Sequence, residues 1–566
     1  MVGFIIAYFR RNFYKITRFL ANGDGICYNN VNRIFEYGEN IMLSVTHTAA
    51  TLGADGYEVS VECLVKRGLP DFEIVGLPDA AVRESEKRIF AGSENSGLPL
   101  PPSEISINLA PADLKKEGTA MDLAILVAVY QGCGFLRGDL GDMCFLGEIS
   151  FSGEIRPVRG ALGMTIAAIN AGRHHIFVPA GNLREASVAY REDVYIYGVP
   201  DISSLIGHLN GRAPLEPASC NPYEQLEHLR TAEDFSQVKG QFRAKRAMET
   251  AAAGGHNILL IGPPGSGKSM LAKRLPTILP RMSYEEALEA TKIYSCAGML
   301  NEEIPFILRR PFRSPHHSLS TAALVGGGKV PSPGEISLAH NGVLFLDEFP
   351  EFRKDSLEAL RQPIEDQVVT ITRAAGRVTY PSSFMLVCAM NPCRCGYYGS
   401  RNGTCTCKKE EIHKYLSKIS GPMLDRIDIQ IEMPELSFAE LSEMQPAEPS
   451  AAVRERVEAA RELSQRRFRE AGYKDYAVKN NAAMQTDELR AFCALDEECQ
   501  KVMENVFAKI NLSARAYDRI LRVARTLRDL EYKPGETPED GVIGGRIQKH
   551  NLMEAVQMRA LDRKYW

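Results

Sequence analysis

The spacing of apolar residues changes along the chain and divides it into three parts. Residues 80–96 carry the charged, amphipathic pattern of a surface helix, whereas residues 120–130 are almost entirely apolar, as in a buried helix. Short stretches around them alternate or run apolar as β-strands do. This mixture predicts a first domain of α+β or α/β type over residues 43–210. The predicted strands are Val59–Val65, Phe72–Val75 and Ile105–Leu109.

The rest of the chain has two further patterns. A Pro-rich stretch at 211–230 predicts a linker. Residues 231–435 contain apolar runs that predict buried strands of an α/β domain. Residues 436–566 are rich in Glu, Arg, Ala and Leu with helical spacing, and within them 453–470 is predicted first as a solvent-facing charged helix.

The first 41 residues differ from everything that follows. Their short apolar run, Phe4–Tyr8, precedes the basic residues, which is the reverse of a secretory signal. Gly38 and Glu39 can be encoded by a purine tract like a ribosome-binding site, and the next two codons would form its spacer. We therefore expect the segment up to Met42 to be a translated leader or a disordered extension, with Met42 as the native start.

Composition and charge limit the partners. The 566 residues are enough for about three domains with their own cores. The net charge of −4 excludes a general basic surface, so a nucleic-acid contact would need a local patch or an assembled pore. No apolar run reaches the ~18–20 residues of a membrane span, and we expect no membrane contact.

The 13 cysteines are mostly scattered, and several lie in apolar sequence surroundings that predict free buried thiols. Free thiols indicate a reducing cytoplasm. The cysteines in apolar surroundings are Cys63, Cys133, Cys144, Cys296 and Cys388.

The strongest chemical signal is a G-x-x-x-x-G-K-S motif between an apolar run, 257–261, and an amphipathic stretch, 270–275. Such a loop wraps backbone N–H groups around phosphates, while its lysine reaches the β/γ-phosphates and its serine holds Mg²⁺. The sequence therefore predicts an ATP·Mg²⁺ site. Its residues are Gly262, Pro263, Pro264, Gly265, Ser266, Gly267, Lys268 and Ser269.

A second apolar run, Val343–Leu346, ends in the acids Asp347 and Glu348. Adjacent acids at the end of a buried strand are costly unless a cation or water lies there. We expect Asp347 to hold Mg²⁺ through water and Glu348 to polarise the attacking water.

Several further segments resemble one family closely. They are Arg309–His317, Pro333–Gly342, Leu360–Glu365, Ala389–Cys393, Ser420–Asp428 and Leu512–Arg519. Over 43–566 the chain is similar to the YifB/ComM family of magnesium-chelatase-like AAA+ ATPases. The resemblance implies a Lon-protease-like domain at 43–210, an AAA+ core with a helix-2 insertion and a pre-sensor hairpin at 231–435, and a helical lid at 436–566. ComM members are hexameric DNA helicases that promote branch migration during natural transformation.

The resemblance also implies catalytic roles. Asn391, after an apolar strand, matches the sensor-1 amide that orients water; the alternative is an ordinary turn residue before Pro392. Arg426 matches the arginine finger supplied to a neighbouring subunit; the alternative is an intrachain ion pair with Asp425 or Asp428. Arg515 matches the sensor-2 arginine of the lid, although Arg519 and Arg522 lie one and two turns later.

The first domain is expected to be proteolytically inactive. In active Lon proteases a serine and a lysine form the catalytic dyad, and the matching positions here are Ala120 and Leu162. Thr119 is a neighbouring hydroxyl without a matched lysine. The domain is then a scaffold for assembly or substrate contact.

Four further cysteines, Cys393, Cys395, Cys405 and Cys407, lie in one Gly-rich loop directly after Asn391. Four thiolates suit tetrahedral Zn²⁺, with free thiols or a redox-labile loop as the alternative.

Residues 368–380 predict a β-hairpin whose tip carries Arg373 and Arg377. Six copies would form a positive ring able to track DNA phosphates, and Lys329 in the Gly-rich insertion would add to it. The alternative is that these are ordinary surface charges. His316 and His317 are interpreted as packing or hydrogen-bonding groups rather than metal ligands.

These patterns lead to one principal hypothesis, an ATP-driven homohexameric motor acting on single-stranded or branched DNA. A chelatase-type or chaperone-like motor that remodels a protein partner, and a non-catalytic assembly that holds ATP as a structural ligand, are the alternatives.

Overall fold

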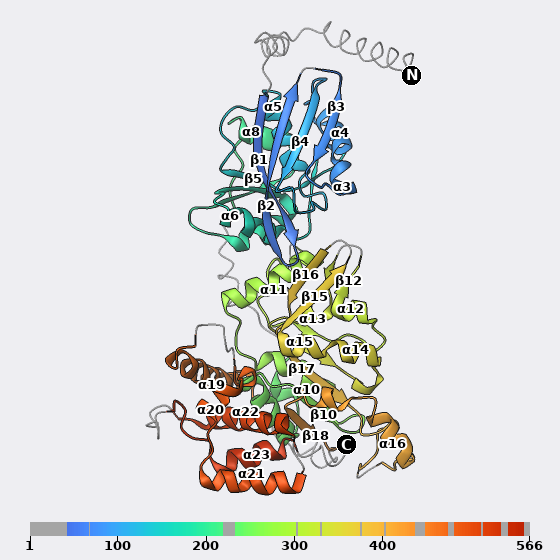
Figure 1. The fold of residues 1–566 in the computed structure, drawn as a ribbon, viewed down its shortest axis with the longest axis vertical. Coiled ribbons are helices and arrows are strands. Elements are labelled where there is room, and N and C mark those ends of the chain that lie inside the picture. The colour runs from blue at the N-terminus through green and yellow to red at the C-terminus, as the bar shows by residue number, and fades with distance from the viewer. Residues whose placement is uncertain are drawn as a thin grey trace.

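The protein is elongated, with three parts that follow one another along its length (Figure 1). The structure, a computed structural model, describes residues 42–66, 68–218, 233–301, 304–328, 331–373, 376–400, 403–435, 448–473, 480–510, 513–533 and 542–559. Residues 1–41, where a leader was expected, and Lys329 lie outside these ranges. Within the described ranges, none of the helices has the length and apolar character needed to cross a bilayer.

The first part is a mixed sheet covered by helices. Its strands are β1 Met42–Leu52, β2 Asp55–Lys66, β3 Asp71–Val75, β4 Glu104–Ala110, β5 Met143–Phe145, β6 Glu148–Ile149, β7 Ile155–Arg156, β8 His175–Pro179 and β9 Tyr195–Val199. Seven of them form one sheet in the order β3-β4-β2-β1-β5-β8-β9. The β1–β2 and β2–β4 pairs are antiparallel, and the other neighbours are parallel.

The helices of the first part follow the predicted pattern with one difference. The apolar run becomes α5, nearly all of whose side chains are buried. The predicted helix at 80–96 is instead two helices separated at Glu84. The Asp79 side chain caps the first of them by accepting a hydrogen bond from the backbone N–H of Val82. The helices are α3 Ala80–Arg83, α4 Ser85–Asn95, α5 Asp122–Gly132, α6 Ala161–Asn170, α7 Leu183–Ala186 and α8 Ile202–Leu209.

The second part is an α/β layer on a parallel sheet of five strands. Its strands are β10 Ile258–Ile261, β11 Phe312–Arg313, β14 Val343–Leu346, β17 Met385–Met390 and β18 Ile429–Glu432. They lie in the order β11-β14-β17-β10-β18. The side chains of β10, β14 and β17 are all buried, which explains why the sequence shows continuous apolar runs there. Its helices are α9 Phe242–Gly254, α10 Lys268–Arg274, α11 Tyr284–Ala297, α14 Lys354–Ala359, α15 Arg361–Asp366, α16 Lys409–Leu416 and α17 Gly421–Leu424.

Two small sheets project from this layer toward the first part (Figure 1). One contains the predicted hairpin, whose strands β15 Val368–Arg373 and β16 Gly376–Pro381 pair antiparallel. The other lies in the segment before β14 and contains β12 Gly326–Gly327 and β13 Ser332–Pro333, flanked by α12 Thr321–Val325 and α13 Glu335–Leu338.

The first part rests on α11, and its Ala54 shares a buried cluster with Tyr380 of the hairpin strand β16. The Lys292 ammonium lies 2.5 Å from an Asp55 carboxylate oxygen at the turn between β1 and β2. The Cys296 thiol donates to the Gly53 carbonyl at 3.1 Å, and the Tyr284 hydroxyl donates to the Val188 carbonyl at 2.7 Å. Apolar residues of both parts also share one buried cluster. The first part is therefore held against the layer that carries the phosphate loop.

The third part is helical. Its helices are α19 Ser450–Glu470, α20 Thr486–Phe492, α21 Glu497–Ile510, α22 Ala514–Glu531 and α23 Lys549–Gln557. The charged helix α19 is not simply solvent-facing, because Val453, Val457 and Phe468 join the core. The prediction for 453–470 was therefore wrong for one face.

A buried ion cluster fixes α19 against α22. The Arg467 guanidinium makes two hydrogen bonds to the Asp529 carboxylate, at 2.7 and 2.8 Å, and Arg525 donates to the same carboxylate at 2.7 Å. Burial alone would raise the pKa of Asp529, but the two arginines lower it to about 2. Its stabilising charge is thus present above the unfolded pKa of about 3.9 and is lost as the pH falls toward 2.

Replacing Asp529 with Asn should destabilise the protein strongly, because two buried guanidinium groups would lose their counter-charge. We expect the free energy of unfolding, measured by urea denaturation, to fall by about 3–5 kcal/mol. The control is Glu470→Gln, which removes an equivalent charge from the exposed Arg466–Glu470 pair of α19 and should change little. Equal effects of the two substitutions would contradict this account.

Candidate nucleotide site

The phosphate loop joins a buried strand to a helix. The four side chains of β10 are fully buried, and α10 begins at Lys268 directly after the loop. Gly267 has φ 88°, a left-handed conformation that favours glycine and turns the chain into the helix. The loop therefore has the strand–loop–helix setting that the motif requires.

Lys268 lies inside this loop. Its ammonium donates to the carbonyls of Gly262 at 2.7 Å and Pro263 at 2.9 Å, and to the Asn391 side-chain oxygen at 3.1 Å. Burial lowers the pKa of Lys268 to about 8, and the nearby Asp347 opposes this shift. A bound phosphate would favour the charged form further.

The predicted magnesium ligands also meet. The Ser269 hydroxyl donates to an Asp347 carboxylate oxygen at 2.6 Å. A hydroxyl and a carboxylate at the carboxyl end of a strand are oxygen donors of the kind that Mg²⁺ takes together with nucleotide phosphates. Ser269 and Asp347 would hold this ion, which would neutralise phosphate charge.

Glu348 follows Asp347 and has φ 52°, a left-handed conformation rare for a residue other than glycine. Its side chain is 57% exposed, and a carboxylate oxygen lies 3.0 Å from Nδ1 of His317. The exposed carboxylate is reachable by solvent, as its predicted role as a base for water requires, and His317 contacts it.

His317 is a candidate site residue that sequence reasoning did not place at the nucleotide site. Its assignment as a packing or hydrogen-bonding group named no partner, and the structure pairs it with Glu348. The signal lay in its position just beyond β11, because β11 is the parallel neighbour of the strand that ends at Asp347. His316 instead bonds to the Ser318 hydroxyl.

Arg426 is far from the phosphate loop of its own chain along the sheet. It precedes β18, and the next residues bond to Asn257, which precedes β10, whereas the loop follows the other end of β10. Its guanidinium lies 2.6 Å from a Glu365 carboxylate oxygen. The intrachain partner is therefore Glu365 rather than Asp425 or Asp428.

The arginines of the C-terminal part also differ from one another in their surroundings. Arg515 is exposed at the start of α22, and the structure does not bring it to the phosphate loop. One turn later Arg519 pairs with Asp428, which also contacts His256. Burial opposes ionisation of Asp428, but Arg519 and His256 hold its pKa well below the ordinary value.

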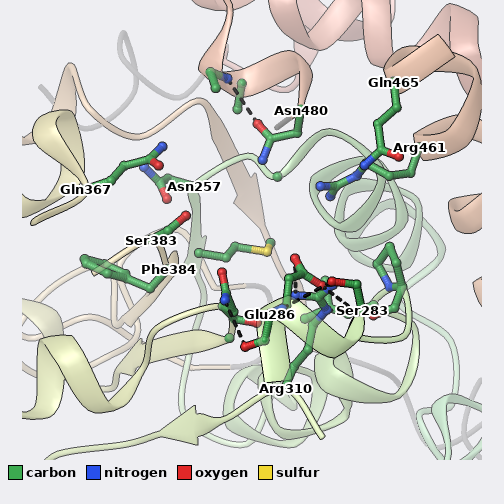
Figure 2. Close-up of a pocket in the computed structure, with 18 of the residues that line it drawn as sticks. Asn257, Ser283, Glu286, Arg310, Gln367, Ser383, Phe384, Arg461, Gln465 and Asn480 are labelled. Atoms are coloured by element: carbon green, nitrogen blue, oxygen red, sulfur yellow. Dashed lines mark hydrogen bonds and ion pairs between the residues drawn. The ribbon is translucent and has the colours of Figure 1, made fainter. Parts of the chain in front are cut away.

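A cavity of about 840 Å³ opens on this side of the sheet, between the α/β layer and the C-terminal helices. Figure 2 shows Glu286 and Arg310 from the layer opposite Arg461 and Asn480 from the helical part. Arg310 and Glu286 are joined at 2.8 Å. Lys268 is not among the lining residues, so this cavity is separate from the phosphate loop.

Comparison with known proteins shows which family the chain resembles. Models of the magnesium chelatase subunit ChlI match residues 61–182 and 234–441, and the model of its C-terminal region matches 447–559. Protein YifB of Escherichia coli is 41% identical over 525 residues, which are 92% of this chain and 98% of the relative. Competence protein ComM of Haemophilus influenzae is 38% identical over 528 residues, with the same coverage.

The chain belongs to the YifB/ComM family of magnesium-chelatase-like AAA+ ATPases. A more distant similarity, 24% identity over 180 residues, links it to the DNA replication licensing factor mcm-6 of Caenorhabditis briggsae. That match covers 32% of this chain and 18% of the relative.

In this YifB/ComM chain, the structure also shows the surroundings of Ala120 and Leu162, the positions that the resemblance to Lon proteases matches to the catalytic dyad. Ala120 and Leu162 are buried in the same apolar cluster. The Thr119 hydroxyl donates to a Glu148 carboxylate oxygen at 2.5 Å rather than to a lysine. A Ser–Lys dyad would need both side chains replaced.

The hairpin of this family member is described only in part. Arg377 is exposed on β16 and lies opposite Thr372 of β15. The backbone of Arg373 pairs with Gly376, but its side chain and residues 374–375 are outside the described residues, as is Lys329.

The four cysteines that were predicted to bind a metal lie close together. The sulfurs of Cys393, Cys395, Cys405 and Cys407 all lie within 4.8 Å of one another. Desolvation opposes ionisation of Cys395, but backbone N–H groups of Tyr397 and Thr406 lower its pKa to about 6. Four such sulfurs can hold a soft metal ion.

Removing His317 should raise ATP turnover measured without a partner molecule, because its contact occupies a carboxylate oxygen of Glu348, the predicted acceptor of the water proton. One hydrogen bond is worth about 1 kcal/mol, so His317→Ala should increase kcat roughly fivefold. The matched control, His316→Ala, should leave kcat unchanged. A fall in turnover for His317→Ala would mean that the histidine positions the base instead.

Proposed function

We propose that this chain is an ATP hydrolase that assembles as a homohexameric ring and moves DNA, as a helicase that drives branch migration of recombination intermediates. The observation that carries the ATPase proposal is the convergence of Lys268, Ser269, Asp347 and Asn391 at one sheet edge. In this proposal Lys268 binds the phosphates, Ser269 and Asp347 hold Mg²⁺, Asn391 orients the water and Glu348 accepts its proton.

The ring is proposed because the site needs a positive charge from outside the chain. Arg426 lies on the opposite side of the sheet from its own phosphate loop, as does the cavity lined by Glu365 and Arg519. A neighbour that docks its phosphate loop there would receive Arg426 as an arginine finger, worth ~10³–10⁵ in rate. Arg515 at the exposed start of α22 would act at the same boundary.

DNA is proposed as the polymer along which the ring moves, for two reasons. One full-length relative is named a competence protein, and a partial relative is named a DNA replication licensing factor. The hairpin β15–β16 carries Arg377 on an exposed position and Arg373 at its end, and repeated around a ring they would contact phosphates. Lys329 in the insertion would add charge.

A second candidate, a motor that remodels a protein partner, is favoured by the family models, which are named for a magnesium chelatase subunit. The two candidates differ in what stimulates ATP turnover. Branched DNA should raise the rate several-fold if DNA is the track, and should leave it unchanged if a protein is. In either case the first domain is proposed as a scaffold without protease activity, and Zn²⁺ as the ion of the cysteine cluster.

Mixing two inactive variants tests the shared site. Glu348→Gln and Arg426→Ala should each abolish turnover alone. In mixed rings, an intact Glu348 from one chain meets an intact Arg426 from the other, so turnover should return in part. The control mixture is Glu348→Gln with Lys268→Ala, whose defects lie on the same face and cannot complement. Absence of recovery in the first mixture would place Arg426 outside the neighbour's site.

The hairpin has its own test. Arg377→Ala should abolish ATP-driven movement of a four-way DNA junction while changing basal turnover less than threefold, because the residue contacts the track and not the nucleotide. Arg466→Ala, which removes an exposed arginine from α19, is the control and should leave junction movement intact. Full junction movement by Arg377→Ala would contradict the assignment of this hairpin position.

A further inference from the structure

The loop between β17 and α16 brings its four sulfurs to metal-binding distances. Sγ of Cys393 lies 3.3 Å from that of Cys395 and 3.7 Å from that of Cys405, and the last two are 3.6 Å apart. A disulfide would need about 2.05 Å. A tetrahedral Zn²⁺ with bonds of about 2.3 Å places its sulfurs about 3.8 Å apart. The cluster therefore has the dimensions of a four-thiolate zinc site.

The surroundings of the sulfurs also suit bound thiolates. Cys393 is fully buried in the cluster that includes Met390 of β17 and Tyr415 of α16, so one ligand is anchored in the core. The backbone N–H of Tyr398 donates to Cys393 Sγ at 3.3 Å. Such second-layer donors orient metal ligands and stabilise their negative charge.

The same loop touches the nucleotide site at two places. Cys393 comes two residues after Asn391, whose side-chain oxygen accepts a hydrogen bond from Lys268 at 3.1 Å. Gly396 packs directly on the phosphate loop, because a Cβ at this position would lie 2.6 Å from Cδ of Pro264. The position of the cysteine loop therefore sets the positions of Asn391 and Pro264.

We propose that Zn²⁺ bound by Cys393, Cys395, Cys405 and Cys407 is a structural component of the nucleotide site, so that metal occupancy controls ATP binding and turnover. The four thiols release their protons to solvent as the ion binds. The ion does not touch the nucleotide; it holds the loop that positions Asn391 and Pro264. The effect on turnover rests on the proposed ATPase function, whereas metal binding and nucleotide affinity do not.

The first experiment measures metal content. Protein purified without chelator should contain about one zinc per chain by inductively coupled plasma mass spectrometry, and protein reconstituted with Co²⁺ should show thiolate-to-cobalt absorption. Cys405→Ala should lose both signals. The control, Cys388→Ala, removes a buried thiol of β17 that is not one of the four cysteines, and this variant should retain both signals.

The second experiment measures coupling. A zinc-selective chelator, added with Mg²⁺ in excess, should weaken binding of a fluorescent ATP analogue and lower kcat/KM roughly 10- to 100-fold, the range for displaced catalytic groups. Added Zn²⁺ should restore both. Gly396→Ala should retain zinc yet raise the KM for ATP, because its methyl group displaces Pro264.

The outcomes are separable. Zinc well below one per chain, or disulfides in the cluster, would overturn the metal site. Stoichiometric zinc whose removal leaves both analogue affinity and kcat/KM unchanged would overturn the coupling. Loss of analogue affinity on zinc removal, in a protein that never hydrolyses ATP, would support the coupling and contradict the proposed ATPase.

Discussion

The register of three short parallel strands determines the candidate site. β14, β17 and β10 are neighbours in which Leu346 lies opposite Cys388 and Ile261 opposite Met390. Because their side chains are buried on both faces, a change of register would disrupt the core. The chain leaves these strands at one sheet edge, where open α/β sheets bind ligands. Asp347, Asn391 and Lys268 meet there for this reason, although they are distant in sequence.

The same sheet has two chemically different edges. The carboxyl edge holds Lys268, Ser269 and Asp347, the proposed phosphate and magnesium ligands, whereas the opposite edge holds Arg426, Arg519 and the large cavity beside the C-terminal helices. A single chain cannot place Arg426 beside its own Lys268 without breaking the pairing of β10 with β18. In the proposed ring, assembly completes the site, whereas the cysteine loop and His317 contact only its nucleotide side.

Sequence predicted the features whose signals are local. The phosphate loop, the apolar strands and the β15–β16 hairpin each follow from a short pattern, and the structure contains them. Contacts between distant segments could not be predicted in this way. In the sequence, Arg467 resembles an exposed arginine of a helix. Only the structure shows that it is buried in an ion pair with Asp529, which lies on another helix. The contact between His317 and Glu348 is likewise visible only in the structure.

In the proposed ring, each ATP site is built from two chains. The most direct measurement is ATP turnover per chain as a function of protein concentration, with the assembly state followed by mass photometry in the same samples. Turnover per chain should fall on dilution in step with the loss of rings. Full turnover per chain in samples that contain only monomers would contradict it.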